Sequence, residues 1–152
     1  MSWTYGVKIE VDDAGDFVVS VRDLPEAQTS GDTGEEAIAL AADAIGVAVG
    51  ARIDHEEDLA DPSPVAPGEI AISLSLRLSA KATLYRLWRN SGVTRLELAR
   101  RMGRTENEAR RILDPYHAAK LDDIEAVARA LGARLAIEVA PAPTREFTAA
   151  AE

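Results

Sequence analysis

The sequence contains no cysteine at all, and only 5% of its residues are aromatic. The absence of cysteine excludes disulfides, thiolate metal sites and cysteine nucleophiles. A core with so few aromatic rings must be built mainly from Ala, Leu, Val and Ile. No apolar run approaches the roughly 18 residues that cross a membrane, and the first residues lack the basic-then-apolar pattern of a secretory signal. We therefore expect a cytoplasmic protein with no membrane segment.

What the sequence does contain is an unequal distribution of charge. The net charge is −9, but residues 1–70 hold 16 acidic and 3 basic side chains (−13), whereas residues 71–152 hold 10 acidic and 14 basic ones (+4). Within residues 77–111, ten Lys or Arg stand against three Glu (+7). Such asymmetry favours two surfaces with different partners, and the alternative is two ordinary solvated faces.

The first half of the chain predicts a small antiparallel sheet with one helix. Alternating apolar residues, separated by turn-forming clusters, predict strands at residues 3–11, 17–21 and 27–30. Thr33 can cap a helix, with Glu36 closing a capping box, and the helical spacing of apolar residues continues to about Arg52.

The next segment predicts a connection followed by one more strand. Residues 54–69 are acidic and then rich in proline, without a periodic apolar face, which is typical of a loop or a linker. Residues 70–76 alternate strictly, and we expect them to return to the first sheet. Residues 1–76 are accordingly predicted to form one domain.

The second half has the pattern of a helix-turn-helix. A helix is expected over residues 79–90, and two further capping boxes follow eleven residues apart, Thr94 with Glu97 and Thr105 with Glu108. Gly103 stands where the first of these helices must end, with an expected positive φ. The residues expected to line the two helices are Leu96, Ala99 and Met102 in the first and Ala109, Ile112 and Leu113 in the second.

In this motif the second helix reads the major groove, and the first crosses the phosphate backbone. The candidate base-reading residues are Thr105, Glu106, Asn107, Arg110 and Arg111. The candidate phosphate contacts are Arg95, Arg100, Arg101 and Arg104. The alternative is a helical hairpin whose arginines only solvate its surface.

The C-terminal part predicts a helix over residues 121–131, ended by Gly132, and a short strand over residues 135–139. A lone strand has an unpaired edge, and pairing with the same strand of a second copy would cover it. We therefore expect a homodimer or a tetramer. The DNA-binding domain is predicted to span residues 77–140, followed by a flexible tail at 141–152.

An ordered set of segments in the first half resembles the HicB antitoxins of bacterial type II toxin–antitoxin pairs. These segments are Tyr5, residues 15–21, Asp23-Leu24-Pro25, residues 29–33 and Glu35-Glu36-Ala37. The resemblance implies an α+β protein whose N-terminal domain is a reduced ribonuclease H-like fold without nuclease activity. It also implies binding to HicA, a small basic mRNA-cleaving toxin, and repression of the pair's own operator DNA.

The residues expected to bind the toxin are Asp16, Asp23, Leu24, Glu26 and Asp32. Glu26 is a departure from the family, because many relatives have Gly at this position, and it predicts a different backbone in that turn. An acidic domain suits such a partner, since it attracts a basic toxin and repels RNA.

Two other functions are alternatives to the antitoxin. A metal-dependent nuclease would need converging carboxylates, and the available ones (Glu10, Asp12, Asp13, Asp16 and Asp23) fall mostly in a hairpin turn. His55 and His117 have no nucleophile motif beside them, and neither a phosphate loop nor zinc spacing is present. We therefore expect no catalysis, metal or cofactor. The second alternative is a one-component transcriptional repressor whose N-terminal domain senses a small molecule.

Overall fold

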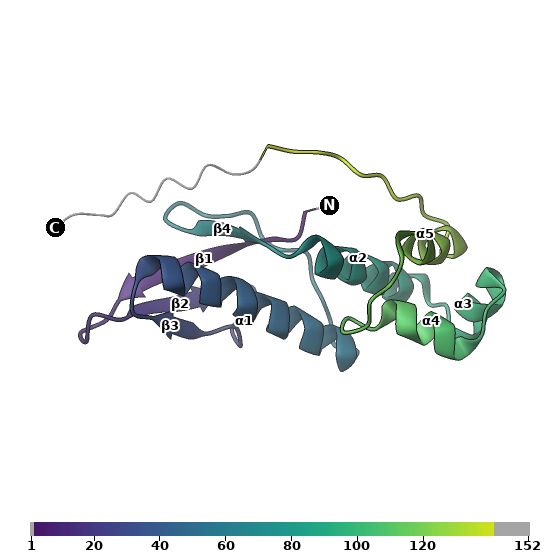
Figure 1. The fold of residues 1–152 in the computed structure, drawn as a ribbon, viewed down its shortest axis with the longest axis horizontal. Helices are drawn as coiled ribbons and strands as arrows, with labels where there is room; N and C mark the ends of the chain where they lie inside the picture. Colours follow the sequence, from purple (N-terminus) through teal and green to yellow (C-terminus); the bar gives the residue numbers. More distant parts are fainter. Residues whose placement is uncertain (1, 142–152) are drawn as a thin grey trace.

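The computed structural model describes residues 2–141, so almost all of the predicted tail lies outside the described residues. Figure 1 shows an elongated molecule with a sheet and one long helix at one end and a group of short helices at the other. This arrangement confirms the expected α+β class. No described helix is long and apolar enough to cross a membrane.

The sheet has four antiparallel strands in the order β3-β2-β1-β4. Its strands are β1 (Thr4–Val11), β2 (Phe17–Val21), β3 (Thr29–Gly31) and β4 (Ile70–Ser73). The predicted β1–β2 hairpin is confirmed, with Val7 opposite Val21. The Asp12 carboxylate accepts hydrogen bonds from two turn amides, and Gly15 supplies the positive φ that the turn needs.

Helix α1 (Gly34–Asp54) covers one face of this sheet. Buried side chains of β1, β2 and β4 pack against a stripe of small and branched residues on α1: Ala37, Ala41, Ile45 and Val49. The approach is closest at Gly31, where a Cβ would lie 2.8 Å from the Ala37 nitrogen. The helix begins at the predicted Thr33 cap, but the Glu36 carboxylate accepts from the Asp32 amide instead of closing a capping box.

The predicted linker is a fixed loop. Leu59 is buried, the Asp23 carboxylate accepts from both the amide and the hydroxyl of Ser63, and Asp61 pairs with Arg86 of the following helix. The absence of a periodic apolar face correctly excluded regular structure here. The sequence pattern could not predict the contacts that fix the loop, because each contact involves a residue distant in the sequence.

Helix α2 (Leu76–Ser91) connects the sheet to the short helices. It begins three residues earlier than expected, because Ser75 caps it and β4 ends at Ser73. The Trp3 indole nitrogen donates to the Thr83 hydroxyl (2.9 Å), and the Tyr85 hydroxyl donates to the Glu57 carbonyl (2.6 Å). The helix is therefore tied to the N-terminal unit at two points.

The remaining helices are α3 (Arg95–Met102), α4 (Glu106–Leu113) and α5 (Leu121–Ala130). Gly103 ends α3 with a φ of +66°, as predicted. The Thr105–Glu108 capping box is confirmed, whereas Thr94 caps α3 alone because Glu97 pairs with two arginines. One core prediction is wrong: Leu96 is 59% exposed, and Leu98 is the buried leucine of α3.

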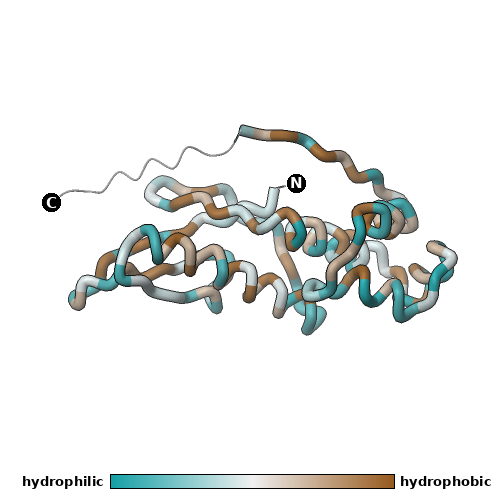
Figure 2. Tube along the Cα trace, in the orientation of Figure 1, coloured by the Kyte–Doolittle hydropathy of each residue, from teal (hydrophilic) through white to brown (hydrophobic). Residues whose placement is uncertain are grey.

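The predicted strand at residues 135–139 does not form in the single chain, where residues 133–141 have no regular structure. Ile137 and Val139 are 75% and 93% exposed, and Figure 2 shows a hydrophobic stretch in the extended segment after α5. A strand exists only when a neighbouring strand accepts and donates its hydrogen bonds, and one copy of the chain supplies none here.

Candidate nucleic-acid and protein interfaces

The N-terminus of α4 is rigidly built. The Thr105 hydroxyl accepts from the Glu108 amide, and the Glu108 carboxylate accepts from both the amide (2.8 Å) and the hydroxyl (2.8 Å) of Thr105. These hydrogen bonds, led by the one from the Thr105 amide, hold the pKa of Glu108 below its ordinary value. Thr105, a predicted base contact, is therefore engaged in starting the helix.

The other predicted base-reading residues lie on the exposed side of α4. Glu106, Asn107, Arg110 and Arg111 are all exposed, while Ala109 and Ile112 face the core. Arg110 Nη2 donates to Asn107 Oδ1 at 2.8 Å, one helical turn away. The structure thus brings an amide and a guanidinium together on an open helix face, and both groups can make paired hydrogen bonds to base edges.

The four predicted phosphate contacts differ in their surroundings. Arg100 is 78% exposed, and Arg101 is half-exposed; both pair with Glu97. Arg104 pairs with Asp123 of α5 at 2.6 Å. Arg95 pairs with Glu56 and lies over the Trp88 ring, 4.9 Å from its centroid. Arg100 is thus the most available to a ligand, whereas Arg95 connects α3 to the end of α1.

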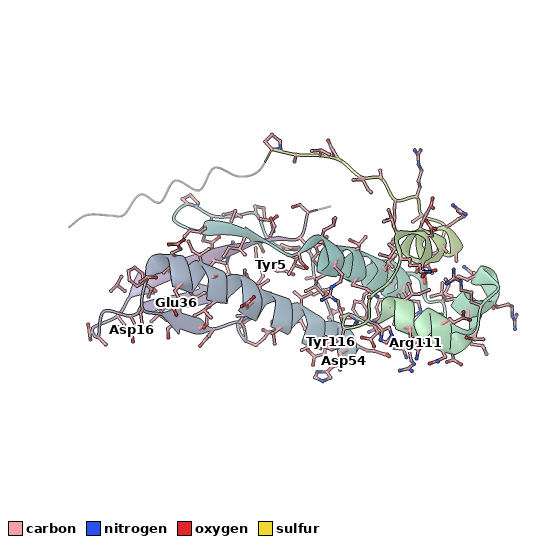
Figure 3. The ribbon with its side chains drawn as sticks, viewed as in Figure 1. Tyr5, Asp16, Glu36, Asp54, Arg111 and Tyr116 are labelled. Atoms are coloured by element: carbon pink, nitrogen blue, oxygen red, sulfur yellow. The ribbon has the colours of Figure 1, made fainter. Side chains whose placement is uncertain are left out.

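The five predicted toxin contacts also separate into two groups. Leu24 is buried, Asp23 is bonded to Ser63, and Glu26 forms a bidentate pair with Arg52 that lowers the pKa of Glu26. Asp32 is exposed and Asp16 is half-buried. Figure 3 shows Asp16 and Glu36 near the end of the sheet farthest from α4.

The backbone at Glu26 is ordinary. Among the described residues other than glycine, Glu56 alone has a positive φ. The turn after Pro25 therefore uses a conformation open to any residue, and the carboxylate at this position gains Arg52 as a partner.

The predicted toxin contacts did not include the acidic side chains that are exposed on α1. Glu35, Glu36 and Asp43 are exposed, and they extend the acidic surface beyond Asp32. The available signal was that these acidic residues fall between the buried apolar positions of α1. Among the described residues, no group of three or more His, Asp or Glu side chains is arranged to hold a metal ion.

The fold and these surfaces define an α+β protein in which an acidic sheet-and-helix unit is joined to short helices that carry arginine. Residues 4–83 match the family model described as the HicB-like antitoxin of bacterial toxin–antitoxin systems. The chain belongs to this HicB-like antitoxin family.

Relatives extend the similarity beyond the matched residues. Antitoxin HicB 1 of Photorhabdus laumondii is 36% identical over 135 residues, which cover 89% of this chain and 86% of that protein. Antitoxin HicB of Escherichia coli K12 is 34% identical over 133 residues, 88% of this chain and 96% of that one. The crystal structure of the N-terminal domain of Burkholderia pseudomallei antitoxin HicB aligns with 48% of this chain and 96% of its own, at 21% identity and a TM-score of 0.38.

Proposed function

We propose that this chain neutralises a HicA-type mRNA-cleaving toxin through its N-terminal unit and represses its own operon by binding operator DNA through α3 and α4. The observation that carries the proposal is the separation of an acidic surface and an arginine-bearing helix face at opposite ends of one elongated molecule. We place the division near residues 76 and 77, with the DNA-binding unit ending near residue 140. Neither role requires catalysis or a cofactor from this chain.

The toxin-binding surface that we propose is the exposed acidic edge around the start of α1. It comprises Asp32, Glu35, Glu36 and Asp43, with Asp16 at the adjoining hairpin. A basic RNA-binding toxin is attracted to this surface by long-range electrostatics, and its RNA substrate is repelled. Covering the toxin's RNA-binding surface is sufficient to stop cleavage.

Charge reversal tests this surface. Asp32→Lys combined with Glu35→Lys should slow association with the toxin about ten-fold or more at low salt, and the difference should shrink as salt rises. Asp122→Lys with Glu125→Lys on α5 makes the same change in net charge elsewhere and is the matched control. Association rates measured by surface plasmon resonance at several salt concentrations provide the readout. Equal slowing by the two double variants would contradict a local toxin site.

We expect that a stable toxin-binding fragment has to extend past the division at residues 76 and 77 and include α2. A fragment ending near Ser79 contains the whole sheet, but it lacks Thr83 and Tyr85, which bond Trp3 and the loop at Glu57. A fragment of residues 1–92 keeps these bonds.

We also propose a homodimer, or a tetramer made of two such dimers, through residues 135–139. Leu135, Ile137 and Val139 alternate along an extended segment, and the last two are exposed in the single chain. Pairing with the same segment of a second copy would satisfy its backbone and place two α4 helices symmetrically. Light scattering should show at least a dimer at tens of micromolar, and Ile137→Lys with Val139→Lys should shift it towards monomer. A wild-type monomer at that concentration would refute the pairing.

A further inference from the structure

Lys81 of α2 is the one fully buried charged side chain among residues 2–141, with an exposed fraction of 0%. Its Nζ donates to the carbonyl of Ile112 at 2.5 Å and lies 3.5 Å from the carbonyl of Arg111. Both carbonyls belong to the last turn of α4. A single ammonium group of α2 therefore holds the C-terminus of the helix that carries Asn107 and Arg110.

The sequence after α4 explains why these carbonyls need a donor from elsewhere. The residue four positions after Arg111 is Pro115, which has no N–H to donate. The residue four positions after Ile112 is Tyr116, and its amide donates instead to the Asp114 carboxylate at 2.8 Å. Unsatisfied carbonyls at a helix C-terminus carry partial negative charge, so a cation is the favoured partner.

Burying this ammonium group is costly, which argues that its position matters. Burial lowers the pKa of Lys81 to about 8, while the nearby Asp114 carboxylate opposes that shift and Arg77 adds to it. An apolar side chain of similar length would fill the same space without the desolvation cost. Unlike such a side chain, the lysine can donate hydrogen bonds to the carbonyls of Arg111 and Ile112.

Lys81 lies on α2, and α2 is itself hydrogen-bonded to the N-terminal unit. Thr83, two residues from Lys81, accepts from Trp3, and Tyr85 donates to Glu57. The connection from α4 to α5 contacts α1, where a Cβ at Gly50 would lie 3.3 Å from the Tyr116 ring. Figure 3 shows Tyr116 and Asp54 together where α1 ends beside this connection. Thus α2 contacts the C-terminal end of α4, and α1 contacts Tyr116 in the connection that follows.

We infer that Lys81 is a positioning residue for DNA reading. It fixes the orientation of α4, and hence of Asn107 and Arg110, by binding the Ile112 and Arg111 carbonyls, which the residues after α4 leave without backbone donors. The inference rests on the proposed DNA binding by α4. Lys81 does not touch DNA and acts through the helix that it holds.

The test compares Lys81→Met, which keeps the length and removes the donor and the charge, with Arg89→Met on the exposed side of α2. The first readout is hydrogen–deuterium exchange of the full chain, which needs no DNA. Leaving buried carbonyls unsatisfied should accelerate exchange of the α4 amides about ten-fold or more in Lys81→Met, with the α1 amides unchanged. Arg89→Met should change neither.

The second readout is DNA affinity, measured with a fragment from upstream of the coding sequence and a scrambled fragment of the same length. Lys81→Met should reduce the ratio of the two affinities about ten-fold, while binding to scrambled DNA stays within about two-fold. Lys81→Gln keeps an N–H donor and should retain part of the preference. It also carries the comparison if Lys81→Met does not fold.

A third readout is the pH dependence of stability. The unfolded chain has a lysine pKa of about 10.4, above the value of about 8 in the folded protein, so between pH 8 and 10 the unfolded state binds more protons. Stability contributed by this site therefore rises with pH across that window, and Lys81→Met should lack the rise. Above pH 10 the trend should reverse, because burial raises the pKa of Tyr5 to about 12.

The outcomes separate this inference from the proposed function. If the wild-type protein does not prefer the upstream fragment, DNA binding is wrong, and the exchange measurement still shows whether Lys81 holds α4. Unchanged α4 exchange in Lys81→Met overturns the anchoring. Equal acceleration of α1 and α4, or faster α4 exchange with an unchanged affinity ratio, overturns the positioning role.

Discussion

Alanine at Asn107 or at Arg110 is expected to weaken binding to operator DNA by about 1–3 kcal/mol and to relax sequence preference at particular base pairs. Both side chains are exposed on α4, and the 2.8 Å hydrogen bond between them holds the amide and the guanidinium in one arrangement. An ordered pair loses less conformational freedom when it binds bases. Gel-shift titrations with operator and scrambled DNA measure the effect as a ratio of affinities.

Arg100→Ala is the matched control, because this arginine is 78% exposed on the preceding helix. Its loss should weaken all DNA sequences alike and reduce the slope of log affinity against log salt by about one. Arg95→Ala should behave differently from both, since Arg95 is engaged with Glu56 and Trp88. If neither Asn107→Ala nor Arg110→Ala changes the operator-to-scrambled ratio, α4 is not the reading helix.

Leu98→Ala is expected to lower the free energy of unfolding by about 2–5 kcal/mol, because it removes a fully buried side chain from the core between α3 and its neighbours. Leu96→Ala, two residues away on the same helix, should change it by less than about 0.5 kcal/mol, since Leu96 is 59% exposed. The chemical change is identical at the two positions, so the difference isolates burial.

Urea unfolding followed by circular dichroism gives both values, provided that the m-value stays constant between the variants. The Leu98→Ala protein should also lose DNA binding at temperatures where the Leu96→Ala protein retains it. A cost at Leu96 as large as that at Leu98 would show that α3 meets a partner surface, such as a second copy, through Leu96.

Much of the local structure was predictable because its causes are local. Alternating residues in β1, the Thr105–Glu108 capping box and the glycine at the end of α3 each depend on neighbours within a few positions. The same holds for the helical spacing in α5, where Ile124, Val127 and Ala128 are buried as expected. These features were confirmed to within a few residues at most boundaries.

Other features depended on which distant residues meet. A short helix of eight residues offers too few turns for periodicity to decide between Leu96 and Leu98, and the position of α3 among its neighbours decided it. The loop after α1 is fixed because Asp23, Arg86 and Tyr85 reach it from other elements. Arg95 shared its residue type and local setting with the exposed arginines, yet Trp88 and Glu56 engage it.

The sequence by itself therefore determined the class of the fold, the order of its elements as far as α5, the charge of its two halves and the helix that presents Asn107 and Arg110. Composition belongs to the chain as a whole, and periodicity and capping depend on residues close together in the sequence. None of the three depends on how distant segments pack. The tertiary structure alone decided that Lys81 is buried against the end of α4, that Leu24 belongs to the core, and that residues 135–139 have no partner within one copy. The burial of a side chain and the pairing of a strand depend on segments far apart in the sequence, so they are decided only when those segments pack together.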